Sequence, residues 1–179
     1  SGVLNLAFAT IAFNSANSTG GVYASSSTIK SNNSIIANNV ARNSGAQVTG
    51  SFVSQGFNLL GQSTGATITG DTTGDILNVD PKLEPTLTSS TNGTVLTKVH
   101  RLRPDSPAID AGDSDFLPPP SVDQRGAPFA RVVVGGIDIG AYERQTLSLV
   151  VDTLVDEDDG DYSPGDLSLR EAIGLANSN

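Results

Sequence analysis

The chain repeats a short apolar segment at a constant interval of 24 residues: TIAFN at Thr10–Asn14, SIIAN at Ser34–Asn38 and NLLGQ at Asn58–Gln62. Two further sets of residues keep the same interval, and they are Ile29, Val53 and Leu77, and Thr28, Phe52 and Ile76. Segments rich in Gly, Asn, Ser and Thr, residues that are typical of turns, separate these sets. This spacing predicts short strands, each stacked on the equivalent strand one turn of the chain later.

Stacked short strands of this kind are typical of a right-handed parallel β-helix, here with about 24 residues per coil. Successive coils would rise by about 4.8 Å, the usual distance between paired strands. We expect one internal stack made of Ile11, Ile35 and Leu59. We also expect Asn14 and Asn38 to form a polar ladder at a corner of the coils.

An antiparallel β-sandwich with accidental spacing is the alternative fold. Such a sandwich would need tight hairpin signals such as Asn-Gly, but Asn92–Gly93, the one pair of this kind, lies outside the repeat. We therefore expect an all-β chain that ends in a short C-terminal capping helix. Its expected parts are β-helix coils over residues 1–79, a loop-rich closing unit over 80–146 and a strand, acidic loop and helix over 147–179.

The overall composition excludes several classes of protein and site. The 179 residues contain no Cys, which rules out disulfides and Cys-ligated metals, and the net charge of −9 argues against nucleic acid and anionic membranes as partners. No apolar run is long enough for membrane insertion, and the first residues do not have the pattern of a signal peptide. An export signal would therefore have been removed or lie outside this chain.

Acidic residues are distributed unevenly along the chain. Residues 1–70 contain no Asp or Glu, and their basic side chains are Lys30 and Arg42. Enzymes that cleave sugars need carboxylates as acids, bases or metal ligands. The coil segment therefore argues against catalysis, and its surface of Ser, Thr and Asn either binds glycans or only keeps the chain soluble.

Residues 80–146 are rich in proline and predict a loop-rich unit that packs over the last coil and closes its open edge. Val95–Val99 alternates like a strand, Arg131–Tyr142 contains two more strand-like runs, and Ala108–Gly112 suits a short buried segment. Four acids and one arginine lie beside tight turns here and predict a buried ionic network. They are Asp110, Asp123, Arg125, Asp138 and Glu143.

A calcium site is the alternative use of this region, with Asp110, Asp113 or Asp115 and backbone carbonyls as ligands. His100 is the one histidine of the chain, and no nucleophilic serine motif surrounds it. A catalytic triad is therefore not expected, and a surface or packing role is the default for this side chain.

The C-terminal segment begins with a predicted strand at Leu147–Leu154, and a strongly acidic loop follows it. Asp156, Asp158 and Asp161 are candidate Ca²⁺ ligands because their spacing partly matches a calcium loop. The order of residues in an EF-hand is lacking, so a solvated acidic loop explains the same pattern equally well.

Ser168 and Glu171 form the S-x-x-E capping box that begins a helix. The helix would carry one apolar face, made of Leu169, Ala172, Ile173 and Ala176. Because it is too short to be stable alone, it must dock on something. The residues expected to act in capping and assembly are Leu167, Ser168, Leu169, Arg170, Glu171 and Ile173.

Three blocks of sequence together resemble the C-terminal module of the bacterial surface β-helix proteins known as choice-of-anchor Q domain proteins. They are SPAIDAGD at Ser106–Asp113, DQRGAP at Asp123–Pro128 and DIGAYE at Asp138–Glu143. The strand, acidic loop and LSLREAI helix resemble the CSLREA-type segment of such proteins, with Leu167 in place of its cysteine. The resemblance implies an extracellular or cell-surface β-helix without an established enzymatic activity. In that family the CSLREA-type segment precedes the coils and covers their first rung, whereas here it follows the closing unit.

We therefore expect a non-enzymatic structural protein, secreted or on the cell surface, whose β-helix module assembles head to tail into a fibrous or tandem array. Two arrangements would account for the displaced cap. In one, the chain is a fragment of a longer multi-module protein. In the other, it supplies its cap to the first coil of another copy, a heterologous contact that propagates.

Two other classes of function remain as alternatives. A glycan-binding adhesin would need an aromatic platform, for which the candidates are Phe8, Phe13, Tyr23, Phe52 and Phe57. A polysaccharide-degrading enzyme would need acids of the closing unit, such as Asp110 and Asp123, to project over the coils.

Overall fold

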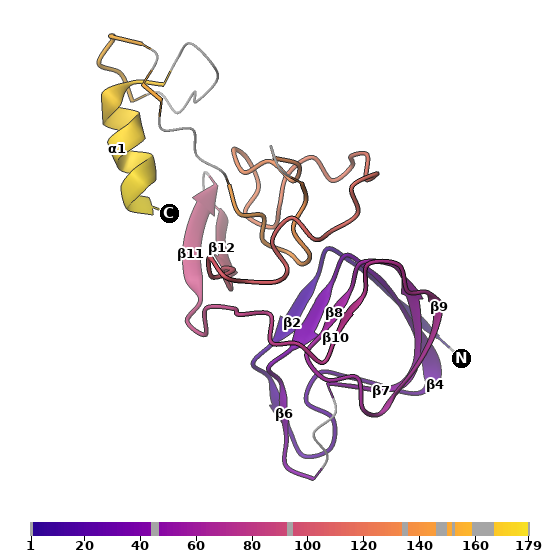
Figure 1. Ribbon diagram of the computed structural model, residues 1–179. Coiled ribbons are helices and arrows are strands. Elements are labelled where there is room, and N and C mark those ends of the chain that lie inside the picture. The colour runs from indigo at the N-terminus through magenta and orange to yellow at the C-terminus, as the bar shows by residue number, and fades with distance from the viewer. Residues whose placement is uncertain are drawn as a thin grey trace. The chain divides into compact units, whose positions relative to one another are not determined.

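The computed structural model describes residues 2–43, 47–92, 95–133, 136–145, 150–151, 153–158 and 167–178. The chain divides into two compact units, Ser1–Arg144 and Gln145–Asn179 (Figure 1). The boundary predicted at residue 79 thus falls inside the first unit.

Most of the regular structure is β-strand. The first sheet has the order β1 (Val3–Ala7), β4 (Val22–Asn32), β7 (Val48–Gln55) and β9 (Ala66–Asp71). The second sheet has the order β2 (Thr10–Ala12), β5 (Ile35–Ala37), β8 (Leu59–Leu60) and β10 (Ile76–Leu77). A short third sheet pairs β3 (Ser15–Ala16) with β6 (Val40–Ala41). The remaining elements are β11 (Thr88–Asn92), β12 (Val95–Val99) and the helix α1 (Leu169–Ser178).

The chain visits the sheets in the same order on each turn: β1, β2 and β3, then β4, β5 and β6, then β7 and β8, and finally β9 and β10. Every pair of neighbours in these three sheets is parallel. Figure 1 shows the strands of the first and second sheets on opposite sides of the turns. The prediction of a strand-rich chain with parallel sheets is therefore confirmed.

The register differs from the predicted interval. Thr10 pairs with Ile35, 25 residues later, and Ile35 pairs with Leu59, 24 residues later. The predicted stack of Ile11, Ile35 and Leu59 is therefore wrong, because Ile11 pairs with Ile36 and Ile36 with Leu60. Successive side chains of a strand point to opposite faces, so this shift of one residue moves Ile35 out of the stack that contains Ile11.

The two other predicted columns are also wrong. Ile29 pairs with Phe52, Thr28 pairs with Ser51, and neither Leu77 nor Ile76 belongs to the first sheet. The cause is a bulge in β4, where the register shifts between Ala24 and Thr28. Three extra residues, 25–27, separate positions whose partners on β7 are adjacent.

The corner between the first and second sheets falls at equivalent positions of three turns. Phe8, Asn33 and Phe57 there have φ of 48°, 45° and 57°. This left-handed conformation reverses the chain direction sharply and is ordinary for Asn but unusual for Phe. The corner geometry is therefore common to the turns, although the residue type is not.

The polar ladder forms with a different partner from the one predicted. Asn39 Oδ1 accepts hydrogen bonds from the backbone N–H and from Nδ2 of Asn14, both at 3.0 Å. Asn39 Nδ2 donates to Ile11 O, and the Gln47 side chain bonds both the backbone and the side chain of Asn39. Asn38 instead has a positive φ of 57°, so its role is conformational.

An apolar core fills the inside of the turns between the first two sheets. Its buried members are Ala24, Ile29, Ile36, Val48, Phe52 and Leu60. At the corner beside this core, Asn58 is completely buried and its side chain bonds Ser31, Ser54 and Asp75. Buried amides of this kind stabilise a turn only when all their bonds are made.

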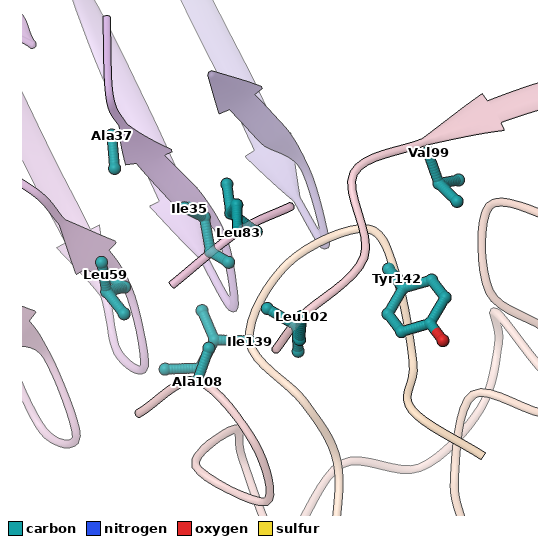
Figure 2. Close-up of a cluster of buried hydrophobic side chains, with 9 residues drawn as sticks. All are labelled: Ile35, Ala37, Leu59, Leu83, Val99, Leu102, Ala108, Ile139 and Tyr142. Carbon is teal, nitrogen blue, oxygen red and sulfur yellow. The ribbon is translucent and has the colours of Figure 1, made fainter. Parts of the chain in front are cut away.

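A second apolar cluster lies on the outer face of the second sheet (Figure 2). Its members are Ile35, Ala37, Leu59, Leu83, Val99, Leu102, Ala108, Ile139 and Tyr142. The segment after residue 80 thus packs along this face and at the corner near Phe8 and Asn33, where Gly112 N–H donates to Ile137 O and Gly140 N–H to Asn33 O. The expectation that it packs over the last coil is wrong, because the outward aliphatic side chains of the second sheet form a better apolar surface.

Residues 80–144 contain few strands, as expected from their prolines. β12 forms at the predicted position, Val95–Val99, and pairs antiparallel with β11. The two strands predicted within Arg131–Tyr142 do not form in the described positions, where an isolated bridge joins Val133 to Gly136. Here the backbone instead bonds to buried charged side chains.

The second unit contains the helix α1, which begins at Leu169 directly after the capping box. The described positions of the strand predicted at Leu147–Leu154, namely 150–151 and 153–154, are not in a strand, and the others lie outside the described residues. In the part of the chain that the structure describes, no helix is long and apolar enough to cross a membrane.

Candidate functional site

The predicted ionic network begins with Asp123 and Arg125. Arg125 Nε and Nη2 donate to Asp123 Oδ2 at 2.9 and 2.7 Å, and Nη2 also donates to Glu143 O at 2.6 Å. The guanidinium lies 3.7 Å from the ring centroid of Phe129 and 4.2 Å from that of Tyr142. Bidentate pairing and ring stacking use the planar shape of arginine, which lysine cannot reproduce.

The other acids of the network hold backbone N–H groups of neighbouring loops. Glu143 N–H donates to Asp123 Oδ2 and Asp138 N–H to Glu143 Oε2, each at 2.9 Å. Asp138 in turn accepts from Arg144 N–H at 2.6 Å and from Asp110 N–H at 2.9 Å. The structure therefore brings all five predicted residues together, with Asp110 contributing its backbone N–H.

Sequence reasoning missed Arg131, which is 1% exposed. Its Nη1 donates to Gly140 O at 3.0 Å and lies 3.5 Å from Glu143 Oε2, and its Nη2 donates to Ala141 O at 2.8 Å. The guanidinium also lies 4.8 Å from the ring centroid of Phe8. Because Arg131 precedes three valines, the sequence indicated a strand there rather than a buried charge.

Burial dominates the electrostatics of this network. Desolvation, reinforced by the charge of Asp138, raises the pKa of Glu143 from 4.5 to about 8 despite the attraction of Arg131. Burial also raises the pKa of Asp138 and lowers that of Arg131. Such groups fix the conformation of loops through their hydrogen bonds, while the charges themselves are costly to bury.

The candidate calcium ligands lie in different surroundings. Asp156 pairs with Arg170 through two hydrogen bonds of 2.8 and 2.7 Å, Asp158 is exposed, and Asp161 lies outside the described residues. In the closing segment, Asp113 Oδ1 accepts from Asp115 N–H at 3.0 Å. Among the residues that the structure describes, no three His, Cys, Asp or Glu side chains are grouped closely enough to hold a metal ion.

The capping box of α1 has the expected geometry. Ser168 N–H donates to Glu171 Oε2 at 3.1 Å, and Glu171 N–H donates to Ser168 Oγ at 3.2 Å. Ser168 Oγ also donates to Glu157 O at 2.7 Å, which holds the acidic segment at the start of the helix.

The apolar face expected on α1 is not the buried one. Leu167 and Ala172 are buried, whereas Leu169 and Ile173 are 63% and 54% exposed and Ala176 is exposed. The helix therefore docks within its unit through the residues around the capping box. Leu169 and Ile173 instead line an apolar groove of about 600 Å³, together with Val151, Leu154, Val155 and others.

The aromatic candidates do not form one platform. Phe52 is buried in the core inside the turns, and Phe8 packs edge-on against Phe116 with ring centroids 4.7 Å apart. Tyr23 is 64% exposed on β4. Phe13 packs against His100, with 4.7 Å between ring centroids.

A cavity of about 270 Å³ lies beside His100, between β2 and β12. We call it the His100 cavity, and its polar lining consists of Thr10, Asn14, Lys98, His100, Gln124 and Tyr142. The lining comes from segments that are far apart in the sequence, so no local motif could have indicated it.

No family model, no curated protein and no solved structure matches the chain.

Proposed function

We propose that the chain is a non-enzymatic structural module of a secreted or cell-surface protein, built as a right-handed parallel β-helix that joins other copies or modules head to tail. Successive turns pass through the same sheets in the same order with parallel pairing, which supports a coiled path. Connections between parallel strands are almost always right-handed, which supports the proposed hand.

A structural role is supported by the use of the buried acids. Asp123, Asp138 and Glu143 are at most 4% exposed, and each accepts hydrogen bonds from backbone N–H groups of neighbouring loops. Carboxylates used in this way hold loops against the second sheet. This use favours a rigid module over a polysaccharide-degrading enzyme.

The first rung offers one surface for assembly. β1 and β2 are the edge strands of their sheets, and Val3 and Leu4 on β1 are 56% and 42% exposed. Residues 1–29 contain no charged side chain. Natural sheets usually protect such edges with lysine, proline or a covering element, so this edge is suited to contact with another protein surface.

The groove of the second unit offers the complementary surface, and its exposed leucine and isoleucine side chains are the observation that carries the assembly proposal. Leu154 is fully exposed, and Leu169 and Ile173 lie beside it in the groove. Asp156 and Arg170, also in the lining, neutralise each other. An uncharged apolar groove of one copy would cover the uncharged first rung of the next, a heterologous contact that propagates.

Light scattering coupled to size-exclusion chromatography, with electron microscopy of the eluted material, tests this proposal. The intact chain should form larger species as its concentration rises. Ile173→Glu, which places a charge in the groove, should remove them. Gly174→Glu adds the same charge one residue further on, where a side chain meets no atom within 4 Å, and should leave assembly unchanged.

A second variant tests the other half of the contact. Leu4→Lys should block assembly from the side of the first rung. Mixed together, Leu4→Lys and Ile173→Glu retain one intact surface each, so they should form dimers but no longer chains. An intact chain that remains monomeric at every concentration would contradict head-to-tail assembly between copies.

A further inference from the structure

We propose that the His100 cavity binds a single carboxylated sugar residue, such as a uronic acid unit of a glycan. This inference does not depend on head-to-tail assembly, because every residue that it uses lies within the first compact unit. It rests on the size, charge and hydrogen-bonding groups of the cavity.

The size of the cavity suits a small ligand. Sites for drug-sized molecules typically measure about 300–1,000 Å³. The His100 cavity, at about 270 Å³, is just below this range and matches a single sugar ring better than an extended chain or a peptide segment.

The local charge is opposite to that of the chain as a whole. Asp and Glu outnumber Lys and Arg by 19 to 10, yet the described residues that line the cavity include Lys98 and His100 and no carboxylate. Val99, between these two residues, is buried in the apolar cluster of Figure 2, so alternation along the strand directs Lys98 and His100 to the same side. A cationic site on an acidic protein favours an anionic ligand.

The orientation of His100 is fixed by two contacts. Its Nδ1 lies 2.8 Å from Glu84 O, and its ring packs against Phe13. A backbone carbonyl only accepts hydrogen bonds, so Nδ1 carries the hydrogen. In the neutral ring, Nε2 is then left as an acceptor for a sugar hydroxyl.

Other polar groups of the lining match the remaining hydroxyls of a sugar. The side chains of Lys98 and Gln124 make no hydrogen bond or ion pair with the described part of the chain, so both are available to a ligand. The amide of Gln124 can both donate and accept, and the Thr10 hydroxyl, which accepts from Ala141 N–H, still has a hydrogen to donate. Figure 2 shows the Tyr142 hydroxyl pointing away from the aliphatic side chains of the cluster.

The single histidine provides a direct measurement of binding. The imidazole resonances of His100 can be followed by NMR while trigalacturonate is added to the intact chain. We expect them to shift in a saturable way. The fully methyl-esterified trisaccharide has the same rings without the charge, and it should bind at least about tenfold more weakly because a charged hydrogen bond is lost.

Variants locate the site. Lys98→Met removes the charge but keeps most of the side-chain length, and it should weaken trigalacturonate binding about tenfold. Lys30→Met makes the same change at an exposed position on β4 and should leave binding unchanged. Gln124→Ala should weaken both the acid and the ester, because it removes bonds to hydroxyls.

Four outcomes would overturn the proposal. They are unshifted His100 resonances at 10 mM trigalacturonate, on the order of the weakest affinities considered specific, equal binding of the methyl ester, unchanged binding by Lys98→Met, and equally strong shifts with N-acetylglycine. The last compound carries a carboxylate without sugar hydroxyls, so it separates recognition of a sugar from recognition of any carboxylate.

Discussion

Arg131 Nη1 lies 3.5 Å from Glu143 Oε2, and both side chains are almost completely buried. The two groups belong to a network with three buried acids, Asp123, Asp138 and Glu143, and two buried arginines, Arg125 and Arg131. Because carboxylates outnumber guanidinium groups, one acid has less to gain from ionisation than the others. Glu143 is that acid, with a pKa raised to about 8.

The raised pKa predicts that the folded chain loses stability as the pH rises from about 4.5 to about 8. In this window the unfolded chain releases the Glu143 proton while the folded chain keeps it, so alkali favours unfolding. At about 1.4 kcal/mol per pKa unit, the change in the free energy of unfolding is of the order of a few kcal/mol. Urea titrations at pH 5, 6.5 and 8 measure it.

Glu143→Gln should flatten this dependence, because its amide does not ionise. Some slope should remain, since the pKa of Asp138 is raised as well. Glu84→Gln, which changes an exposed partner of Arg103, should leave the profile as it is. A free energy of unfolding that increases from pH 5 to pH 8 in the unmodified chain would show that Glu143 is ionised when folded.

Asn58→Asp should strongly destabilise the corner where the turns pass from the first to the second sheet. Asn58 Nδ2 donates to Ser31 O and Ser54 Oγ, each at 2.9 Å, and to Asp75 Oδ1 at 3.1 Å. A carboxylate of the same shape loses these donors and faces Asp75. We expect a loss of about 3 kcal/mol or more, measured by chemical denaturation. Asn17→Asp, at an exposed position, is the matched control, and an equal loss there would refute the argument.

Ile35→Ala should cost about 2–5 kcal/mol, as expected for a core position. Ile35 is 1% exposed because the segment after residue 80 covers the outer face of the second sheet. Val53 pairs with the exposed Lys30 on the outer face of the first sheet, so Val53→Ala should cost about 1 kcal/mol or less. Thermal and chemical denaturation compare the two. Similar small losses would mean that the second sheet is not covered in solution.

Ser168→Ala should weaken the start of α1 by about 1 kcal/mol, because Glu171 N–H loses its acceptor. Hydrogen exchange at the amides of residues 171–173 reports this change locally. Glu171→Gln should have a smaller effect, since its amide oxygen can still accept from Ser168 N–H. Unaltered exchange in Ser168→Ala would mean that the capping box does not hold the helix in solution.

Removal of calcium should leave the melting temperature of the chain unchanged. Asp156, a candidate ligand, is bound by Arg170 through two hydrogen bonds, and a cation would have to displace this partner. Differential scanning calorimetry with EDTA and with added Ca²⁺ tests the expectation. A melting temperature that rises with Ca²⁺ concentration would reveal a site, because a ligand that binds the folded state stabilises it.

The sequence alone indicated which segments form strands of the parallel sheets, because apolar segments separated by turn residues carry that information locally. It also identified the five residues of the ionic network, although it missed Arg131. A buried arginine can be recognised only from the backbone carbonyls that surround it, here those of Gly140 and Ala141.

Tertiary structure decided which face each strand buries. Ile35 and Ile36 are adjacent and equally apolar, yet Ile36 points into the turns and Ile35 points outward. The first turn is one residue longer than the second, and in a strand one residue separates opposite faces. The same applies to the His100 cavity, whose lining includes Thr10, Lys98 and Gln124. Strand positions follow from local patterns, whereas register and cavities follow from packing between segments that are distant in the chain, and only the folded structure shows them.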